Sequence, residues 1–149
     1  NVIGPFWQQN LRSNTITKNV LQNWITEGII DYQGEKKDVK KFIAEADCLV
    51  LPSYREGTSN TLLEASSMEK PVITTNTTGC KEIVEDGITG YLCDVRNSSD
   101  LAEKMEQMLL LSPDDRNEMG KKGRQKIIKE FDKQIVLSAY LKAIDEVLK

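Results

Sequence analysis

The chain contains no histidine, few aromatic residues and no long apolar run. Aromatic residues make up 6% of its 149 residues. Histidine is the commonest zinc ligand and the commonest general base, so its absence argues against a histidine-based zinc site or acid–base centre. No apolar run approaches the ~18 residues of a membrane span, and the first residues do not form a signal peptide. These absences favour a cytoplasmic protein without a membrane span.

The three cysteines and the net charge further limit the class of protein and the partners that we expect. Cys48, Cys80 and Cys93 lack metal-ligand spacing, so we expect free thiols in a reducing cytoplasm. Hydrophobic residues are 39%, charged residues 29% and the net charge is −3, which is typical of one globular domain. Proteins dedicated to nucleic acid are usually basic, so nucleic acid is not expected as a partner. No acidic cluster such as Asp-x-Asp is present, so we expect neither a metal nor another cofactor.

Short apolar runs alternate with amphipathic stretches along the chain. Strands are predicted over 1–5, 29–34, 48–52, 71–75 and 86–93. Helices are predicted over 15–27, 36–46, a stretch ending near Met68, 79–85, 98–111, 113–129 and 133–149. The strands read as buried on both faces, which predicts an α/β, Rossmann-like parallel sheet with helices on both faces. In such sheets ligands bind beyond the carboxyl ends of the strands.

The stretch YREGTSNTLLEA, residues 54–65, follows one of these carboxyl ends. Gly57 permits close approach of a ligand, and Thr58, Ser59, Asn60 and Thr61 would form the first turn of a helix. The N–H groups of a first turn lack intrahelical partners, and the helix dipole favours an anion there. Glu64 would lean back toward that end. With Glu56 on the other side, the pattern suits a diphosphate between two hydroxyl-bearing groups, as in a nucleotide sugar.

The same residues have a reading that needs no ligand. The sequence Thr61-Leu62-Leu63-Glu64 matches a capping box, in which Glu64 would bind the backbone of its own helix. Glu56 would then be a solvated turn residue. The residues alone leave this alternative open.

Residues 46–94 resemble the donor-binding half of retaining, nucleotide-sugar-dependent glycosyltransferases of GT-B architecture, the glycosyl transferases group 1. The hallmark of that family is Glu-x7-Glu in a frame that continues into a Pro-Val-Ile strand and a glycine-rich segment. The matching residues here are Ser53, Glu56-Gly57, Leu63-Glu64-Ala65, Pro71-Val72-Ile73, Gly79, Glu82-Ile83-Val84, Asp86-Gly87 and Gly90. A looser likeness extends from Ile29 to the C-terminal helices.

The resemblance implies a role for each matching position. Glu56 would be the catalytic residue that contacts the transferred sugar, and Glu64 would bind the ribose. Gly79 would line the same cleft, and Gly34 and Glu35 would approach the base. The diphosphate or sugar would face the backbone of Gly57, Thr58, Ser59, Asn60, Thr61 and Leu62. Arg55 and Lys81 lie nearby, but we expect both to be solvated.

The resemblance also implies the enzyme as a whole. Residues 1–149 would be the single donor-binding domain of a hexosyltransferase, the C-terminal half of a GT-B fold, inactive in isolation. The donor would be a UDP-sugar, and the product a bacterial surface polysaccharide. An N-terminal domain upstream of Asn1 would bind a glycan or lipid-linked acceptor and carry the Arg and Lys that neutralise the diphosphate. The basic stretch 121–129 would touch the inner face of the membrane.

Three alternatives remain beside this interpretation. A nucleotide-sugar epimerase would share the nucleotide pocket but relies on acid–base side chains, often histidine. A non-catalytic module would bind a nucleotide or sugar without turnover, although both glutamates are present here. A purely structural domain would bind no nucleotide.

Overall fold

The computed structural model describes residues 1–6 and 16–148, which form two compact units, Asn1–Val39 and Lys40–Lys149. In the first unit, helix α1 spans Lys18–Thr26 and is capped by Thr17, whose hydroxyl oxygen accepts from the Val20 N–H. The predicted strands 1–5 and 29–34 are reduced to one isolated parallel bridge between Val2 and Tyr32. The predicted helix start at Thr15 lies outside the described residues.

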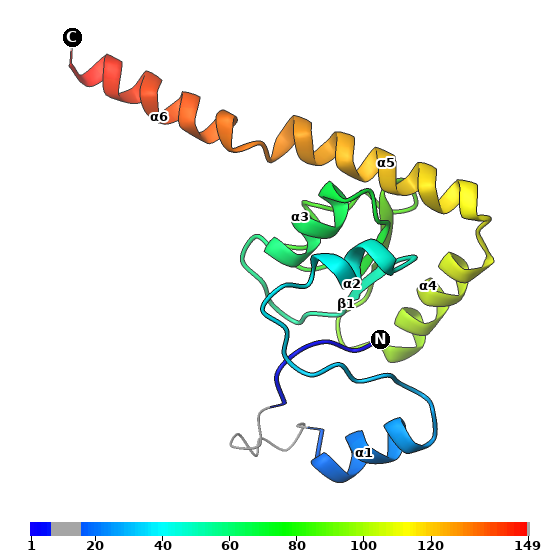
Figure 1. The fold of residues 1–149 in the computed structure, drawn as a ribbon. Helices are drawn as coiled ribbons and strands as arrows, with labels where there is room; N and C mark the ends of the chain where they lie inside the picture. Colours follow the sequence, from blue (N-terminus) through cyan, green and yellow to red (C-terminus); the bar gives the residue numbers. More distant parts are fainter. Residues whose placement is uncertain (7–15, 149) are drawn as a thin grey trace. The chain divides into compact units, whose positions relative to one another are not determined.

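The second unit is the parallel α/β sheet that the sequence predicts (Figure 1). Its order is α2 Lys40–Glu45, β1 Leu49–Leu51, α3 Asn60–Ser67, β2 Val72–Thr75, β3 Gly90–Cys93, α4 Ser98–Leu110, α5 Pro113–Glu130 and α6 Lys133–Val147. The strands pair in parallel in the order β1-β2-β3. The prediction of a helix over 79–85 was wrong. Gly79 takes a φ of +87°, outside helical angles, and the segment forms consecutive turns instead.

The strand register determines which side chains point to each face of the sheet, and helices cover both faces. Val50, Ile73 and Tyr91 stand side by side across the sheet, so they share one face. Ile73 packs there with Met108 of α4 and Met119 of α5. Figure 1 shows α3 on the other side of the strands from α4, and all four residues of β2 are buried. The prediction of a sheet covered on both faces is confirmed.

Helix α5 packs closely against α3 through two glycines. A Cβ at Gly120 would lie 1.9 Å from the backbone oxygen of Glu69, just after α3, so only glycine fits there. A Cβ at Gly123 would meet its nearest atom at 3.7 Å, an ordinary contact. The close packing at Gly120 fixes the position of α5 against α3. It thereby also fixes the position of Phe131, the C-cap of α5. Within residues 1–6 and 16–148, none of the helices has the length and apolar character needed to span a membrane.

These two glycines provide a matched pair of variants. Gly120→Ala should lower the free energy of unfolding by about 1–3 kcal/mol, because the added methyl overlaps backbone atoms. Gly123→Ala should leave it unchanged or raise it by up to ~1 kcal/mol, because alanine is the better helix former. Urea unfolding followed by circular dichroism measures both values, and equal losses would contradict the packing described here.

Candidate functional site

The loop that follows β1 is held by threonines at the end of β2. The Thr74 hydroxyl donates to the Leu51 carbonyl at 2.8 Å, and the Thr75 hydroxyl donates to the Ser53 carbonyl. The Ser53 hydroxyl in turn donates to Glu56 Oε1 at 2.6 Å. Glu56 is half-buried and oriented by this chain of hydrogen bonds. It is therefore not the freely solvated turn residue of the alternative reading.

A second anchor joins the same loop to the turn at Gly79. The Ser59 N–H donates to the Gly79 carbonyl at 3.2 Å, and the Gly79 N–H donates to Glu82 Oε2 at 2.8 Å. A Cβ at Gly79 would stand 1.7 Å from the Gly57 carbonyl oxygen. The φ of +87° is also one that residues with a side chain rarely adopt. Gly79 thus lies against the glutamate loop, as the cleft-lining role requires.

The capping-box alternative is not what the structure shows. The N-cap of α3 is Ser59, and Asn60 is the first helical residue. Thr61 is therefore already inside the helix, at the second position, and cannot cap Glu64. The Glu64 side chain is exposed and has no hydrogen bond or ion pair within the described residues. The Ser59–Gly79 hydrogen bond explains the shift, because it fixes the chain immediately before Asn60.

The N-terminus of α3 has open hydrogen-bond donors. The first intrahelical acceptor, the Ser59 carbonyl, serves Leu63 at 3.1 Å. The N–H groups of Asn60, Thr61 and Leu62 have no acceptor within the described residues, and the Ser59 side chain forms no cap. In contrast, α1, α4, α5 and α6 each have a cap side chain that accepts an N–H. The first turn of α3 has no acidic residue, so its N–H groups and the helix dipole favour an anion there.

Two pockets adjoin this helix. The first, of about 220 Å³, lies at the glutamate loop, and its lining residues are Glu56, Gly57, Thr58, Thr78, Gly79, Glu82, Ile83 and Phe131. Phe131 had no predicted role. Its signals in the sequence were its place between two predicted helices and the stretch 129–132, which belongs to the looser family likeness. Neither signal indicates a pocket formed with loops far away in the sequence.

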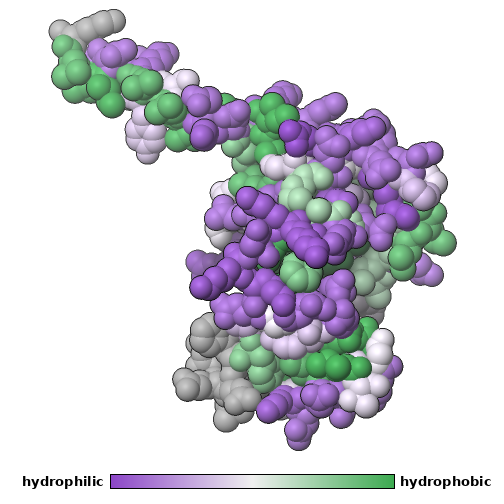
Figure 2. Space-filling view, in the orientation of Figure 1, coloured by the Kyte–Doolittle hydropathy of each residue, from purple (hydrophilic) through white to green (hydrophobic). Residues whose placement is uncertain are grey.

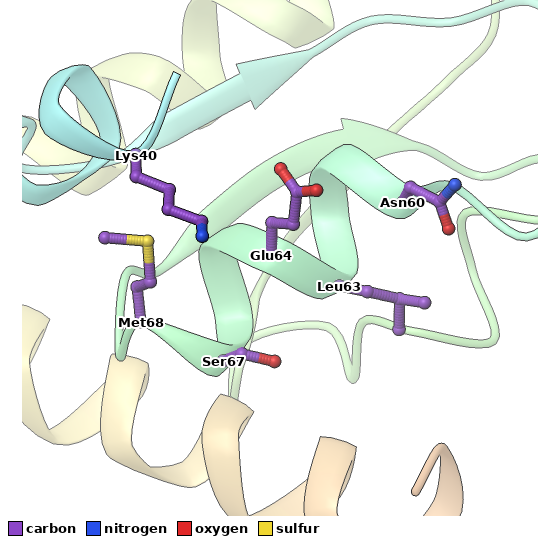
Figure 3. Close-up of a pocket in the computed structure, with 6 residues that line it drawn as sticks. All are labelled: Lys40, Asn60, Leu63, Glu64, Ser67 and Met68. Atoms are coloured by element: carbon purple, nitrogen blue, oxygen red, sulfur yellow. The ribbon is translucent and has the colours of Figure 1, made fainter. Parts of the chain in front are cut away.

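The second pocket, of about 290 Å³, lies along α3 (Figure 3). Its lining residues are Lys40, Asn60, Leu63, Glu64, Ser67 and Met68. The α3 positions recur at the spacing of one helix face, opposite the buried Leu62 and Ala65. Figure 3 shows Lys40 reaching from the start of α2 toward α3, from which the Glu64 carboxylate projects. The sequence analysis missed Lys40, because it stands in a lysine run that resembles a solvated helix face.

The remaining residues that the sequence analysis named lie outside the two pockets or contribute only their backbone. Gly34, with φ +68°, accepts from the Gly4 N–H at 3.0 Å in the first unit, and Glu35 follows it there. Their contact with a base remains a prediction. Arg55 and Lys81 are exposed, as expected for solvated side chains. The side chain of Leu62 belongs to the core, so only its backbone faces the site.

The cysteines do not supply chemistry to this site. Burial raises the pKa of the Cys48 thiol to about 12, despite the opposing charge of Arg116. Burial likewise raises the pKa of Cys93. Both thiols therefore stay neutral at physiological pH, and a neutral thiol is a poor nucleophile. Among the described residues, no group of histidine, cysteine, aspartate or glutamate side chains has the arrangement of a metal site.

Known proteins share this sequence pattern and fold. The pattern of the family described as Glycosyl transferases group 1 matches residues 17–126. An N,N'-diacetylbacillosaminyl-diphospho-undecaprenol alpha-1,3-N-acetylgalactosaminyltransferase of Campylobacter jejuni is 30% identical over 126 residues, which are 85% of this chain and 33% of that protein. This chain therefore spans about a third of the length of that relative.

Solved structures agree with the fold. A glycosyltransferase from Rickettsia africae is 25% identical, with a TM-score of 0.78 over 89% of this chain and 35% of that chain. HepE from Anabaena in complex with UDP is 20% identical, with a TM-score of 0.77 over 87% of this chain and 36% of that chain. The second likeness concerns the fold alone. Both place the chain within a GT-B glycosyltransferase fold.

The contact between Gly79 and Gly57 can be tested by comparing two glycines with positive φ. Gly79→Ala should lower the free energy of unfolding by more than Gly87→Ala. Both variants incur the ~1–2 kcal/mol strain of a left-handed residue, but only the first also forces a methyl into backbone atoms. Gly87 has a φ of +72° and open space around it. Equal losses in urea unfolding would show that φ strain alone explains Gly79.

Proposed function

The chain belongs to the glycosyl transferases group 1 family, and from this premise we propose that it binds the nucleotide-sugar donor of a retaining hexosyltransferase. The observation that supports this most is the open N-terminus of α3, flanked by one pocket with Glu56 and another with Glu64. Family membership favours glycosyl transfer over epimerisation or a purely structural role.

The diphosphate of the donor would bind at the start of α3. The N–H groups of Asn60, Thr61 and Leu62 have no acceptor in the part of the chain that the structure describes, and the helix dipole adds partial positive charge. When the bond to the sugar breaks, negative charge develops on the leaving nucleoside diphosphate. Donors already fixed in place stabilise that charge without reorganisation, each being worth a few kcal/mol.

The nucleoside would bind in the pocket beside Glu64. An ionised carboxylate accepts hydrogen bonds only, so it suits the two neighbouring hydroxyls of a ribose. Lys40 and Asn60 line the same pocket and offer donors for oxygen atoms of the nucleoside. UDP is the favoured nucleotide, since HepE, which shares the fold, holds UDP.

The transferred sugar would lie in the pocket at Glu56. Ser53 fixes one carboxylate oxygen of Glu56 and leaves the other for a sugar hydroxyl. The displacement would proceed with retention through an oxocarbenium-like transition state. Glu56 and Glu64 are not the acid and nucleophile of a hydrolytic glycosidase, because the two residues line separate pockets and Glu64 is assigned to the ribose.

The acceptor would be a glycan or a lipid-linked sugar, and the function a step in bacterial surface-glycan synthesis. The Campylobacter relative is named for a transfer to an undecaprenol diphosphate-linked sugar. Lys121, Lys122 and Lys129 on α5 are exposed and would contact an anionic membrane surface where such acceptors lie. Co-sedimentation with phosphatidylglycerol vesicles at low and high salt tests this contact, and salt-insensitive or absent binding would refute it.

Calorimetric titration with UDP and GDP tests the nucleoside assignment. We expect UDP to bind, and Glu64→Ala to weaken binding by about 1–3 kcal/mol, roughly 5- to 150-fold in Kd, because a charged hydrogen bond is lost. Glu118→Ala is the matched control, since this exposed glutamate of α5 lines neither pocket. It should bind UDP as the parent does.

The variant Glu56→Gln, in the same titration, distinguishes the role of Glu56 from the role of Glu64. It should leave the UDP affinity within about twofold, because Glu56 belongs to the sugar side of the site. A parent chain that binds neither nucleotide, or a Glu64→Ala variant that binds UDP normally, would contradict the proposed function.

A further inference from the structure

Two further side chains line the pocket at Glu56: an aromatic ring and a second carboxylate. Neither has a role in the donor binding proposed above. Phe131 comes from the junction of α5 and α6, and Glu82 comes from the turns after Gly79. Glu82 lies in the Glu82-Ile83-Val84 segment that matches the family pattern, but neither Glu82 nor Phe131 is one of the two glutamates of Glu-x7-Glu. Phe131 and Glu82 both line the same pocket of about 220 Å³ as Glu56, so the three side chains face one shared volume.

Glu82 is held in place and still has accepting capacity. Its Oε2 accepts the Gly79 N–H at 2.8 Å. Its other oxygen has no hydrogen-bond partner within the described residues, and the side chain is exposed to solvent. A carboxylate fixed by one oxygen presents the second in a defined direction. Glu56 is arranged in the same way, with Oε1 bound by the Ser53 hydroxyl.

Phe131 is fixed by its position between two helices. It is the C-cap of α5, where its N–H donates to the Ile127 carbonyl at 2.9 Å. The next residue, Asp132, is the N-cap of α6, and its side chain accepts the Gln134 N–H at 2.8 Å. The Phe131 backbone therefore has little freedom, and its half-buried ring forms a wall of the pocket together with Ile83.

The pocket suits one uncharged sugar ring better than any other part of the donor. A volume of 220 Å³ equals about seven waters at ~30 Å³ each, enough for a single monosaccharide unit. Sugars present apolar C–H faces and a rim of hydroxyls. An apolar wall with a few placed acceptors is how ligand pockets combine affinity with orientation. Two carboxylates disfavour a phosphate here, which leaves the diphosphate at the start of α3.

We propose that Phe131 and Glu82 form the far wall of the transferred-sugar site and determine which sugar it accepts. The Phe131 ring packs against the apolar face of the sugar, and the free oxygen of Glu82 accepts one of its hydroxyls. This inference rests on the proposed function, because it needs a nucleotide to hold the sugar at the pocket. It adds two residues that act on the sugar and not on the nucleotide.

The ratio of two affinities tests this assignment. UDP, UDP-glucose and UDP-N-acetylglucosamine are titrated into the parent chain, Phe131→Leu and Glu82→Gln. We expect both variants to bind UDP within about twofold of the parent and to bind the preferred UDP-sugar about three- to tenfold more weakly. Leucine keeps an apolar side chain, and glutamine keeps an oxygen for the Gly79 N–H, so neither change removes the packing around it.

Phe42→Leu is the matched control, since Phe42 is half-buried on α2 and lines neither pocket. It should leave both affinities unchanged. Parent-like UDP-sugar binding in Phe131→Leu and Glu82→Gln would overturn the inference while leaving the proposed function intact. Equal parent affinity for UDP and every UDP-sugar would also overturn it. Absence of UDP binding in the parent would overturn both.

Fluorine NMR provides a direct readout of the ring. The chain has three phenylalanines, so 4-fluorophenylalanine labelling gives few resonances, and Phe131→Leu identifies that of Phe131. The preferred UDP-sugar should shift the Phe131 resonance, whereas UDP alone should leave it in place. An unchanged resonance with bound UDP-sugar would place the sugar elsewhere.

Discussion

The close approach of Gly79 to Gly57 is the constraint on which the site depends. It brings a turn that follows β2 into backbone contact with the loop that follows β1, at a distance no side chain would allow. The Ser59–Gly79 hydrogen bond then fixes the chain just before α3. The start of the helix, the orientation of its free N–H groups and the shape of the pocket at Glu56 all follow from this one contact. The threonines at the end of β2 reinforce it by holding the other end of the same loop through Leu51 and Ser53.

In this arrangement α3 contributes to the site through its N-terminus and through one exposed face. Its axis points the open N–H groups at an anion, while its exposed face carries Asn60 and Glu64 into the pocket along its side. The loop before it supplies Glu56 to the other pocket. A ligand with a diphosphate at its centre and hydroxyl groups on both sides matches this order. Under the proposed function, the same order would explain why the helix lacks the side-chain cap that α1, α4, α5 and α6 possess, since a capping oxygen would take the place of the diphosphate.

Local patterns in the sequence were sufficient for the parallel sheet, for α1 to α6 and for the residues of the glutamate stretch, but not for the turns at 79–85, where a helix was predicted. Apolar runs without alternation identified β1 and β2, and a glycine between strand and helix located the turn. What the sequence could not decide was the start of α3, because the capping box and the open helix end are both compatible with Thr61-Leu62-Leu63-Glu64. A contact with Gly79, twenty residues from Ser59, decided it. Phe131 and Lys40 were missed because the residues that share their pockets are distant in the chain, and Lys40 also stands in a lysine run typical of a solvated helix face. The strands predicted at 1–5 and 29–34 have the right composition, yet they form one isolated bridge, between Val2 and Tyr32, and a further backbone hydrogen bond from Gly4 to Gly34.

The position of Glu56 is easier to explain under the proposed sugar transfer than under passive binding of a nucleotide. A module that only held a nucleotide would gain nothing from Glu56, because a carboxylate near the diphosphate opposes its binding. The Ser53 hydroxyl nevertheless donates a hydrogen bond that orients this carboxylate, and the Thr75 hydroxyl in turn holds the Ser53 carbonyl. Such an arrangement is useful where positive charge develops, and in sugar transfer positive charge develops at the anomeric carbon of the transferred sugar as the nucleoside diphosphate leaves. Under the proposed function, Glu56 would be a group whose interaction strengthens toward the transition state, which is the requirement for lowering a barrier.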